Sequence, residues 1–408
     1  MKFEKLLHTP DGVRDIYGPE GVAYRELEER LRKTFLSYGY SDIRTPSFEF
    51  FDVYSSERGS VPSRDLYKFF DHDGNTLVLR PDMTPAIARC AAKYYGDIDW
   101  PVRLSYLANT YINYSGYTGR LRERSQAGAE CIGYSGADAD AELIALMISA
   151  LDSCGLKDFR VELGQVNYFR GIAAEAGIDQ DTASELKSLI NGKNFYGLED
   201  YAAEAGLSSE VTRTFMGFSG LFGGRSCIPR ARELTADATA LAALDHLEAI
   251  YGLLAAYGVE DRVIFDLGMF GSYDYYTGVV FRAFAYGSGE PVAAGGRYDR
   301  LMKQFGKDSP AIGFTLTLDS LMRALQKQGS VPAGVDRGTL LVFGDDAAHE
   351  SHITAIDLAQ RLRGEGRSVQ LLRRERDMSP EACMEYAARA GFSRVISIEG
   401  QKTEELAL

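Results

Sequence analysis

The sequence predicts an α+β fold: an antiparallel sheet flanked by helices, followed by a small α/β domain at the C-terminus. Two observations lead to this prediction. Residues 111–133 have the pattern of two extended segments joined by a turn, which is typical of an antiparallel hairpin. Residues 339–398 alternate between strand-like and helical patterns as a βαβαβ series, which indicates a parallel sheet.

Composition limits the possible classes of protein. A chain of 408 residues with 45% hydrophobic and 25% charged residues is long enough for two or three domains with a sizeable core. A net charge of −13 argues against strong nonspecific nucleic-acid binding. The five cysteines are widely scattered and form no Cys-x-x-Cys pair, so neither a zinc site nor a disulfide framework is expected. No signal peptide or membrane-spanning run is apparent, and we expect a cytoplasmic protein.

The first helix is predicted between Pro19 and Gly39. Leu27, Leu31 and Phe35 recur at four-residue spacing, which places them on one face of a helix, and the glycine ends it. The pattern is typical of an amphipathic helix that packs on a sheet.

Strands are predicted at residues 40–46 and 75–80. The second strand leads into a helix over residues 86–95, for which Thr84 is the expected cap and Pro85 suits the first turn. Further elements are predicted as a helix at 138–154, a strand at 159–163, short helices within 168–235, a helix at 236–257, a strand at 263–267, and a strand followed by a helix within 310–325.

The second strand of the 111–133 hairpin carries most of the polar side chains. Arg120, Arg122 and Arg124 alternate with other residues, and Gln126 and Glu130 continue the alternation on the same face. The turn residues are Ser115, Gly116 and Gly119. A face with charge and amide suits a polar ligand better than a core, although an exposed amphipathic hairpin would have the same pattern.

Several motifs resemble those of class II aminoacyl-tRNA synthetases in their histidyl form. Residues 119–130 resemble motif 2, and Leu-Arg-Pro-Asp-Met-Thr at 79–84 resembles a histidine-binding segment with a shorter acid. Residues 274–281 and 294–299 resemble two further histidine signatures. The resemblance implies a class II core at 1–166 and 235–329, a helical insertion at 167–234, and a truncated anticodon-binding-like domain at 338–408.

This resemblance also implies a histidine pocket. Glu130 and Tyr276 would face the imidazole ring, and Asp82, Thr84 and Gln126 would surround the α-amino group. The pocket would also include Tyr275 and Tyr298, with Arg122 as a possible contact for the histidine carboxylate.

Three arginines that serve ATP in the synthetases are replaced in this chain. Their positions are occupied by Ile112, Gly271 and Ser320. Each replacement removes a fixed positive charge directed at phosphate or adenine, so adenylate formation is not expected.

A synthetase-like chain with a histidine site but no adenylation arginines resembles the regulatory subunit of ATP phosphoribosyltransferase, over about residues 5–325. This implies a non-catalytic protein without metal or cofactor, with histidine as effector and the short-form catalytic subunit as partner. The helix, strand and Pro46 resemble motif 1, so a homodimer within a hetero-oligomer is expected. Many members lack a domain corresponding to residues 338–408, which therefore depart from the family pattern.

Alternatives remain open on the sequence alone. An active histidyl-tRNA synthetase would show histidine-dependent pyrophosphate–ATP exchange. A synthetase-like protein directed at tRNA or at another protein would retain tRNA specifically at physiological salt. A structural scaffold with an empty pocket would bind no histidine.

Overall fold

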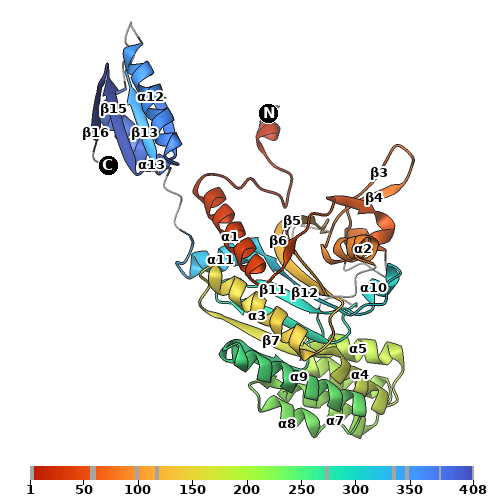
Figure 1. Cartoon of the computed structure of the whole chain (residues 1–408). Helices are drawn as coiled ribbons and strands as arrows, with labels where there is room; N and C mark the ends of the chain where they lie inside the picture. The colour runs from red at the N-terminus through yellow and green to blue at the C-terminus, as the bar shows by residue number, and fades with distance from the viewer. Residues whose placement is uncertain are drawn as a thin grey trace. The chain divides into compact units, whose positions relative to one another are not determined.

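The computed structural model describes residues 4–55, 61–96, 101–114, 119–271, 275–332, 337–344, 349–375 and 378–406 (Figure 1). The chain divides into two compact units. The first consists of Met1–Asp15 and Tyr24–Pro332, and the second of Ile16–Ala23 and Ala333–Leu408.

A nine-stranded sheet forms the centre of the first unit. In sheet order its strands are β1 (Ser41–Asp42), β5 (Val102–Tyr111), β6 (Glu123–Ile132), β12 (Ala311–Thr317), β11 (Ala293–Arg297), β10 (Val279–Ala285), β7 (Phe159–Gln165), β9 (Val263–Asp266) and β8 (Phe222–Gly223). From β5 to β7 in this order, each strand is antiparallel to the next, which confirms the predicted sheet. The strand expected at 40–46 is shorter than predicted, because only Ser41 and Asp42 pair with β5.

The β5–β6 hairpin pairs Val102 with Ile132 at one end and Tyr111 with Glu123 at the other. Because side chains alternate along a strand, Gln126 and Glu130 share one face of β6, as predicted. Of the expected turn residues, Gly119 has a φ of +66°, which favours glycine. The other two, Ser115 and Gly116, lie outside the described residues.

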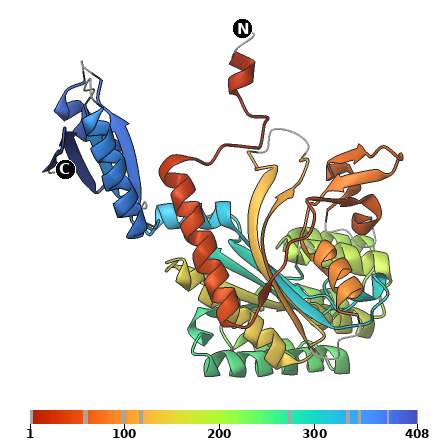
Figure 2. The ribbon, with the colours of Figure 1, turned by 45° about the horizontal axis from the view of Figure 1, so that its top comes forward.

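Long helices cover one face of the sheet: α1 (Gly18–Ser37), α3 (Ala137–Ser153) and α9 (Ala238–Ala256) (Figures 1 and 2). Leu27, Leu31 and Phe35 of α1 are buried, and the Phe35 ring meets Phe314 of β12 edge-on at 6.0 Å. The predicted apolar stripe of this helix therefore packs on the sheet.

The other face carries α2 (Thr84–Tyr94), the short α10 (Leu301–Gln304) and a three-stranded sheet of β2 (Phe48–Phe50), β4 (Thr76–Leu79) and β3 (Lys68–Phe70). Ile87 and Ala88 of α2 belong to the same buried cluster as Tyr106, Tyr276 and Tyr298. The candidate site is located between α2 and the central sheet.

Short helices form the insertion: α4 (Val166–Glu175), α5 (Gln180–Asn191), α6 (Phe195–Glu204), α7 (Ser209–Met216) and α8 (Cys227–Arg232). Phe215 and Phe218 pack with Phe169 and Phe270, with ring centroids 4.9–6.3 Å apart for the contacting pairs. These four rings form a small aromatic core.

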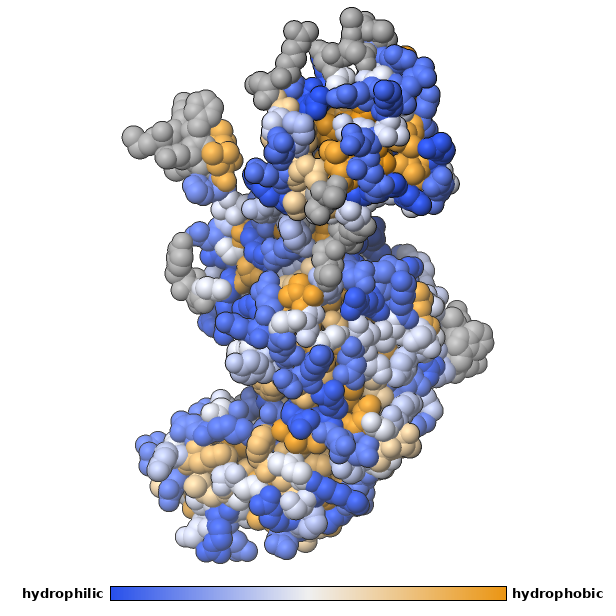
Figure 3. All heavy atoms as spheres, turned by 90° about the vertical axis from the view of Figure 1, so that its left-hand side faces the viewer, coloured by the Kyte–Doolittle hydropathy of each residue, from blue (hydrophilic) through white to orange (hydrophobic). Residues whose placement is uncertain are grey.

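Among the described residues, α9 is the one helix whose length and composition would allow it to cross a membrane. It packs against α3 and α4, as expected for a core helix of a folded domain. On the face of the molecule drawn in Figure 3, apolar residues are broken up by hydrophilic ones.

The second unit contains β13 (Thr339–Phe343), α12 (Glu350–Gly364), β14 (Val369–Arg373), α13 (Pro380–Ala390), β15 (Arg394–Glu399) and β16 (Lys402–Leu406). Strand β13 is parallel to β14 and to β15, which confirms the βαβαβ prediction. The antiparallel strand β16 was not predicted, because its segment Lys-Thr-Glu-Glu-Leu is polar and largely exposed.

Candidate functional site

Glu130 lies near the C-terminal end of β6, and two hydroxyl groups converge on its carboxyl group. The residue is on β6 and only 1% exposed. The Thr84 hydroxyl donates a hydrogen bond to Oε1 over 2.9 Å, and the Tyr298 hydroxyl donates one to Oε2. The structure thus brings together three residues that the sequence assigned to one pocket.

Burial raises the pKa of the Glu130 carboxyl group to about 8, because the ionised form loses its hydration inside the sheet. The hydrogen bonds from Tyr298 and Thr84 oppose this increase, whereas the nearby charge of Asp82 adds to it. The group is therefore mainly protonated at neutral pH. A ligand that supplies N–H donors or a positive charge would stabilise the ionised form.

Strand β12 leaves room for the Glu130 side chain only because residue 313 is glycine. The two residues are directly opposite each other in the β6–β12 register. A Cβ atom at position 313 would lie 1.5 Å from Glu130 Oε2. The sequence did not identify Gly313 as a site residue, since no local pattern indicates which strand pairs with β6.

Asp82 lies beside this carboxyl group and is held by two tyrosines. The Tyr275 hydroxyl donates to Asp82 Oδ2 over 3.3 Å, and the Tyr54 hydroxyl donates to the Asp82 backbone carbonyl over 2.8 Å. Asp82 is 6% exposed and Tyr54 is fully buried. Tyr54 was missed from the sequence, because it precedes Asp82 by 28 residues and belongs to no motif.

The prediction that Thr84 caps a helix is wrong. Thr84 is the first residue of α2, the cap position is Met83, and no side-chain cap hydrogen bond forms there. The Thr84 hydroxyl is instead drawn to the buried Glu130 carboxyl group. Its backbone N–H donates to Asp82 Oδ1 over 3.3 Å, so Thr84 links both acids.

Three tyrosine rings form the wall of the pocket. Tyr275 meets Tyr276 edge-on at 5.1 Å and Tyr298 edge-on at 6.0 Å. Glycines on either side allow this packing: a Cβ at Gly271 would lie 2.5 Å from the Tyr276 ring, and one at Gly296 would lie 2.7 Å from it. The preceding residue of the signature, Asp274, lies outside the described residues.

Gln126 lies on the same face of β6 as Glu130, ~13 Å further along the strand. Its Oε1 atom is buried and has no hydrogen-bond partner among the described residues. A buried acceptor of this kind is costly unless a ligand or water satisfies it. Gln126 therefore stays a candidate contact for an amine.

Arg122 is not brought to the pocket. Its guanidinium donates to the Tyr114 carbonyl over 3.3 Å, and its backbone N–H donates to the Gly12 carbonyl over 2.7 Å. It precedes β6 by one residue, roughly 26 Å along the strand direction from Glu130. Its role as partner for a ligand carboxylate stays a prediction without support from this geometry.

The synthetases carry arginines that bind ATP at three positions. In this chain the residues at these positions make other contacts. Ser320 is fully buried, and its hydroxyl donates to Glu290 Oε1 over 2.8 Å. Gly271 has a φ of +79°, and a side chain there would also collide with Tyr276. The backbone N–H of Ile112 donates to the Arg122 carbonyl over 2.8 Å. Arginine at positions 271 or 320 would require local repacking.

The five cysteines are free thiols, four of them buried. In the described part of the chain, no group of three or more His, Cys, Asp or Glu side chains could hold a metal ion. The pocket therefore presents carboxyl, hydroxyl and amide groups on an aromatic wall, which suits a small ligand rich in nitrogen donors.

Comparison with known proteins agrees with this site. The model of the histidyl-tRNA synthetase family matches residues 12–321. The chain superposes on a histidyl-tRNA synthetase from Nostoc sp. PCC 7120 with a TM-score of 0.81, over 98% of this chain and 97% of that one. At 18% identity this likeness concerns the fold alone. Fold and site together define a class II, histidyl-tRNA synthetase-like protein.

Nearer relatives carry a more particular name. The chain is 36% identical to an ATP phosphoribosyltransferase regulatory subunit from Acetivibrio thermocellus over 403 residues, 99% of this chain and 95% of that protein. It is 37% identical to a protein of the same name from Moorella thermoacetica, over 96% of this chain and 97% of that protein. The chain belongs to the family of ATP phosphoribosyltransferase regulatory subunits.

A solved structure agrees with this assignment. A protein from Bacillus halodurans described as an ATP phosphoribosyltransferase regulatory subunit/histidyl-tRNA synthetase superposes with a TM-score of 0.85 and 31% identity, over 96% of this chain and 98% of that one. The expectation that residues 338–408 depart from the family is wrong for these relatives, because their similarity extends through nearly the whole chain.

Proposed function

We propose that this chain is the non-catalytic regulatory subunit of an ATP phosphoribosyltransferase in histidine biosynthesis, that it activates a separate short-form catalytic subunit, and that it mediates feedback inhibition by histidine. The observation that supports this most is the contrast between an intact acidic pocket around Glu130 and the altered arginine positions beside it. The names of the relatives support a partner subunit.

The pocket chemistry supports histidine as the effector. Glu130 and Tyr276 would meet the two ring nitrogens, because a carboxyl group and a hydroxyl can each donate or accept a hydrogen bond. Asp82, Thr84 and Gln126 would receive the α-amino group. A cationic amine beside Asp82 would also offset part of the cost of burying two acids close together.

The proposal that the chain is not catalytic rests on the altered arginine positions. Transfer to the ATP α-phosphate requires fixed positive charge around the developing charge of the transition state. Gly271 cannot supply that charge, and the buried Ser320 hydroxyl is bonded to the carboxylate of Glu290. We also propose a cytoplasmic homodimer that associates with the catalytic subunit.

Titration calorimetry of the purified chain with histidine tests the effector, and an assay of the catalytic subunit with and without this chain tests the regulatory role. We expect saturable histidine binding, activation of the transferase on mixing, and inhibition when histidine is added. Glu130→Gln should weaken histidine binding by ~30-fold or more, because charge-assisted hydrogen bonds contribute about 2–3 kcal/mol.

Glu123→Gln is a matched control on the same strand. Its carboxylate accepts from the Asn109 amide at the opposite end of β6, so histidine affinity should not change. Absence of histidine binding and of any effect on the transferase would contradict the proposal. Histidine-dependent pyrophosphate–ATP exchange by the chain alone would favour an active synthetase instead.

A further inference from the structure

A loop between β9 and β10, residues 266–271, supports the tyrosine wall of the pocket from behind. Met269 is fully buried in the same cluster as Tyr276 and Tyr298. Gly271 at the end of the loop approaches the Tyr276 ring so closely that a Cβ atom there would lie 2.5 Å from it. Because packed side chains leave little free space, a shift of this loop would displace the tyrosines.

The helical insertion holds this loop from the other side. The Lys193 ammonium lies 2.6 Å from Asp266 Oδ1, which also accepts from the Gly268 backbone N–H over 3.1 Å. The Asn191 side-chain oxygen accepts from the Phe270 backbone N–H over 3.2 Å. Asp266 is 2% exposed, and Lys193 provides the positive charge that compensates its burial. The end of α5 thus fixes both ends of the loop.

The Phe270 ring anchors the loop in the aromatic core of the insertion. It lies 4.9 Å from the Phe169 ring and 6.1 Å from the Phe218 ring, measured between centroids. Gly268 is also close to α5, because a Cβ atom there would lie 3.0 Å from Ile190 Cγ2. The loop is therefore packed between the tyrosine wall and the insertion.

The backbone at Lys193 indicates that its side chain is needed. Lys193 has a φ of +56° and is one of two non-glycine residues in the left-handed region among those described. The backbone N–H groups of Lys193 and Asn194 donate to the carbonyls of Ile190 and Leu189 over 3.0 Å and 2.9 Å, which is the Schellman arrangement at a helix end. Glycine usually occupies this left-handed position, since a side chain there is strained. The strained residue is the one that pairs with Asp266, as expected where strain serves a function.

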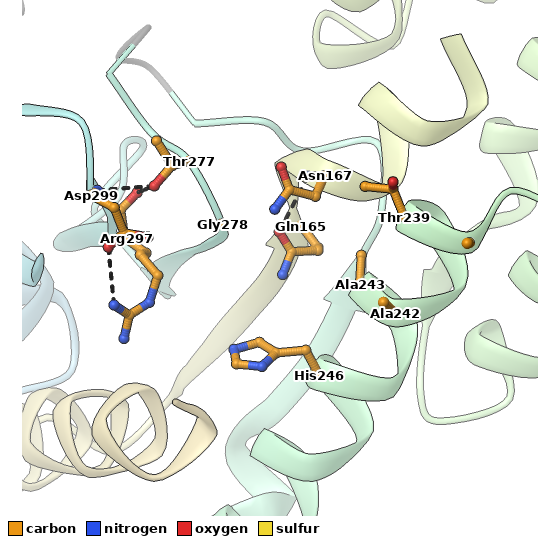
Figure 4. A pocket seen from close by; sticks show the side chains of 11 residues that line it. Gln165, Asn167, Thr239, Ala242, Ala243, His246, Thr277, Gly278, Arg297 and Asp299 are labelled. Atoms are coloured by element: carbon orange, nitrogen blue, oxygen red, sulfur yellow. Dashed lines mark hydrogen bonds and ion pairs between the residues drawn. The ribbon is translucent and has the colours of Figure 1, made fainter. Parts of the chain in front are cut away.

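After the tyrosines, the insertion is in looser contact with the chain. Arg170 of α4 donates to the Tyr276 carbonyl over 3.3 Å. Past this bond, a cavity of about 540 Å³ lies between Asn167 of α4 and the segment of Thr277 and Gly278 (Figure 4). Close packing between the insertion and the tyrosine segment is therefore concentrated in the loop before the tyrosines.

We infer that Lys193 and Asn191 are positioning residues for the histidine pocket, which act through the loop by holding the tyrosine wall in place. The identity of the ligand rests on the proposed function, whereas the support of the wall does not. Because the Tyr298 hydroxyl is bonded to Glu130, release of the loop should weaken ligand binding and loosen the backbone of the wall.

The test uses the full chain and compares two variants with it. Lys193→Met leaves the buried Asp266 carboxylate without its cation. Asn191→Ala removes the acceptor of the Phe270 N–H at an exposed helix end, where alanine is compatible with the helix. Calorimetry should show histidine binding weakened about tenfold in Lys193→Met and about threefold in Asn191→Ala. Asn191→Ala tests the same prediction should Lys193→Met not fold.

Two further variants separate positioning from general loss of stability. Lys193→Arg keeps the charge opposite Asp266 and should restore histidine affinity to within about threefold of the original chain. Arg232→Met is the matched control, because it removes an ion pair of 2.7 Å to Glu248 that joins α8 to α9. This control should bind histidine like the original chain.

Hydrogen exchange followed by mass spectrometry, without histidine, measures the wall directly. Amides of residues 266–271 and 275–279 should exchange about tenfold faster in Lys193→Met than in Arg232→Met or the original chain. Unchanged exchange there, or histidine affinity that is unchanged in Lys193→Met or reduced equally in Arg232→Met, would overturn the inference. If the original chain binds no histidine, the proposed function fails, and the exchange at 275–279 still decides whether Lys193 positions the wall.

Discussion

The two ends of β6 carry different kinds of polar side chains on the same sheet. Near Glu130, hydroxyl groups converge on one buried carboxyl group, and the glycine opposite makes room for that side chain. At the other end, Asp319 accepts from Tyr24 over 2.8 Å and from the Ser125 backbone N–H over 3.3 Å. The first end gathers uncharged hydroxyl donors around one buried acid, whereas at the second end a carboxylate is bonded to a hydroxyl group and a backbone N–H.

The difference shows why arginines near a motif do not by themselves make a phosphate site. Arg124 lies 3.9 Å from Glu290, and Arg323 also pairs with that carboxylate. Positive charges that are neutralised by fixed acids attract phosphate weakly. Four substitutions would break or sharpen this comparison, and they follow from the largest expected effect to the smallest.

The largest effect concerns the pH dependence of stability at Glu130. The unfolded carboxyl group ionises near its usual pKa of 4.5, whereas the folded one keeps its proton up to about 8. The folded state therefore binds more protons between these values, and its free energy of unfolding falls as the pH rises through them. Glu130→Gln should remove this fall, about 4–5 kcal/mol in total, in urea unfolding measured from pH 5 to 9. If the free energy of unfolding of the variant fell with pH as steeply as that of the original chain, the raised pKa of Glu130 would be contradicted.

Gly313→Ala should disrupt the pocket end of the sheet. The added methyl group would collide with Glu130, and a forced shift of this kind costs about 3 kcal/mol of unfolding free energy. Histidine binding should be lost as well. Gly252→Ala on the exposed side of α9 has no atom within 4 Å of the new methyl group and should stabilise the chain by about 0.5–1 kcal/mol. Equal effects of the two variants would refute the assigned role of Gly313.

Ser320→Arg tests whether an arginine at this position can restore the use of ATP. A large charged side chain at a fully buried position should destabilise the chain by about 2 kcal/mol, and it should not restore pyrophosphate–ATP exchange. Ser37→Arg on an exposed helical position is the control and should have almost no effect. Recovery of exchange in the first variant would mean that the nucleotide end remains available.

The smallest effect is expected from Tyr54→Phe. Loss of the hydroxyl that donates to the Asp82 carbonyl should cost about 1 kcal/mol of stability and weaken histidine binding severalfold. Tyr94→Phe is the matched control, because Tyr94 is 65% exposed. Chemical unfolding and histidine titration of both variants measure the difference; an unaltered affinity in Tyr54→Phe would separate Tyr54 from the site.

Much of the local structure could be predicted from the sequence. The alternation of Gln126 and Glu130 placed both on one face, and the spacing of Leu27, Leu31 and Phe35 placed a helix on the sheet. The prediction from the sequence was wrong where one side chain could form either of two hydrogen bonds. Thr84 has a cap residue's chemistry, but a buried carboxyl group 46 residues away takes its hydroxyl.

The sequence by itself determined the periodic elements, the family and most of the side chains around the pocket, because strand and helix periods and short motifs are local properties. The tertiary structure decided the contacts that join distant segments: Gly313 opposite Glu130, Tyr54 on Asp82, and Asp140 between Arg297 and His246. These contacts depend on the order of strands in the sheet. That order is set by packing of the whole core, and no local pattern in the chain records it.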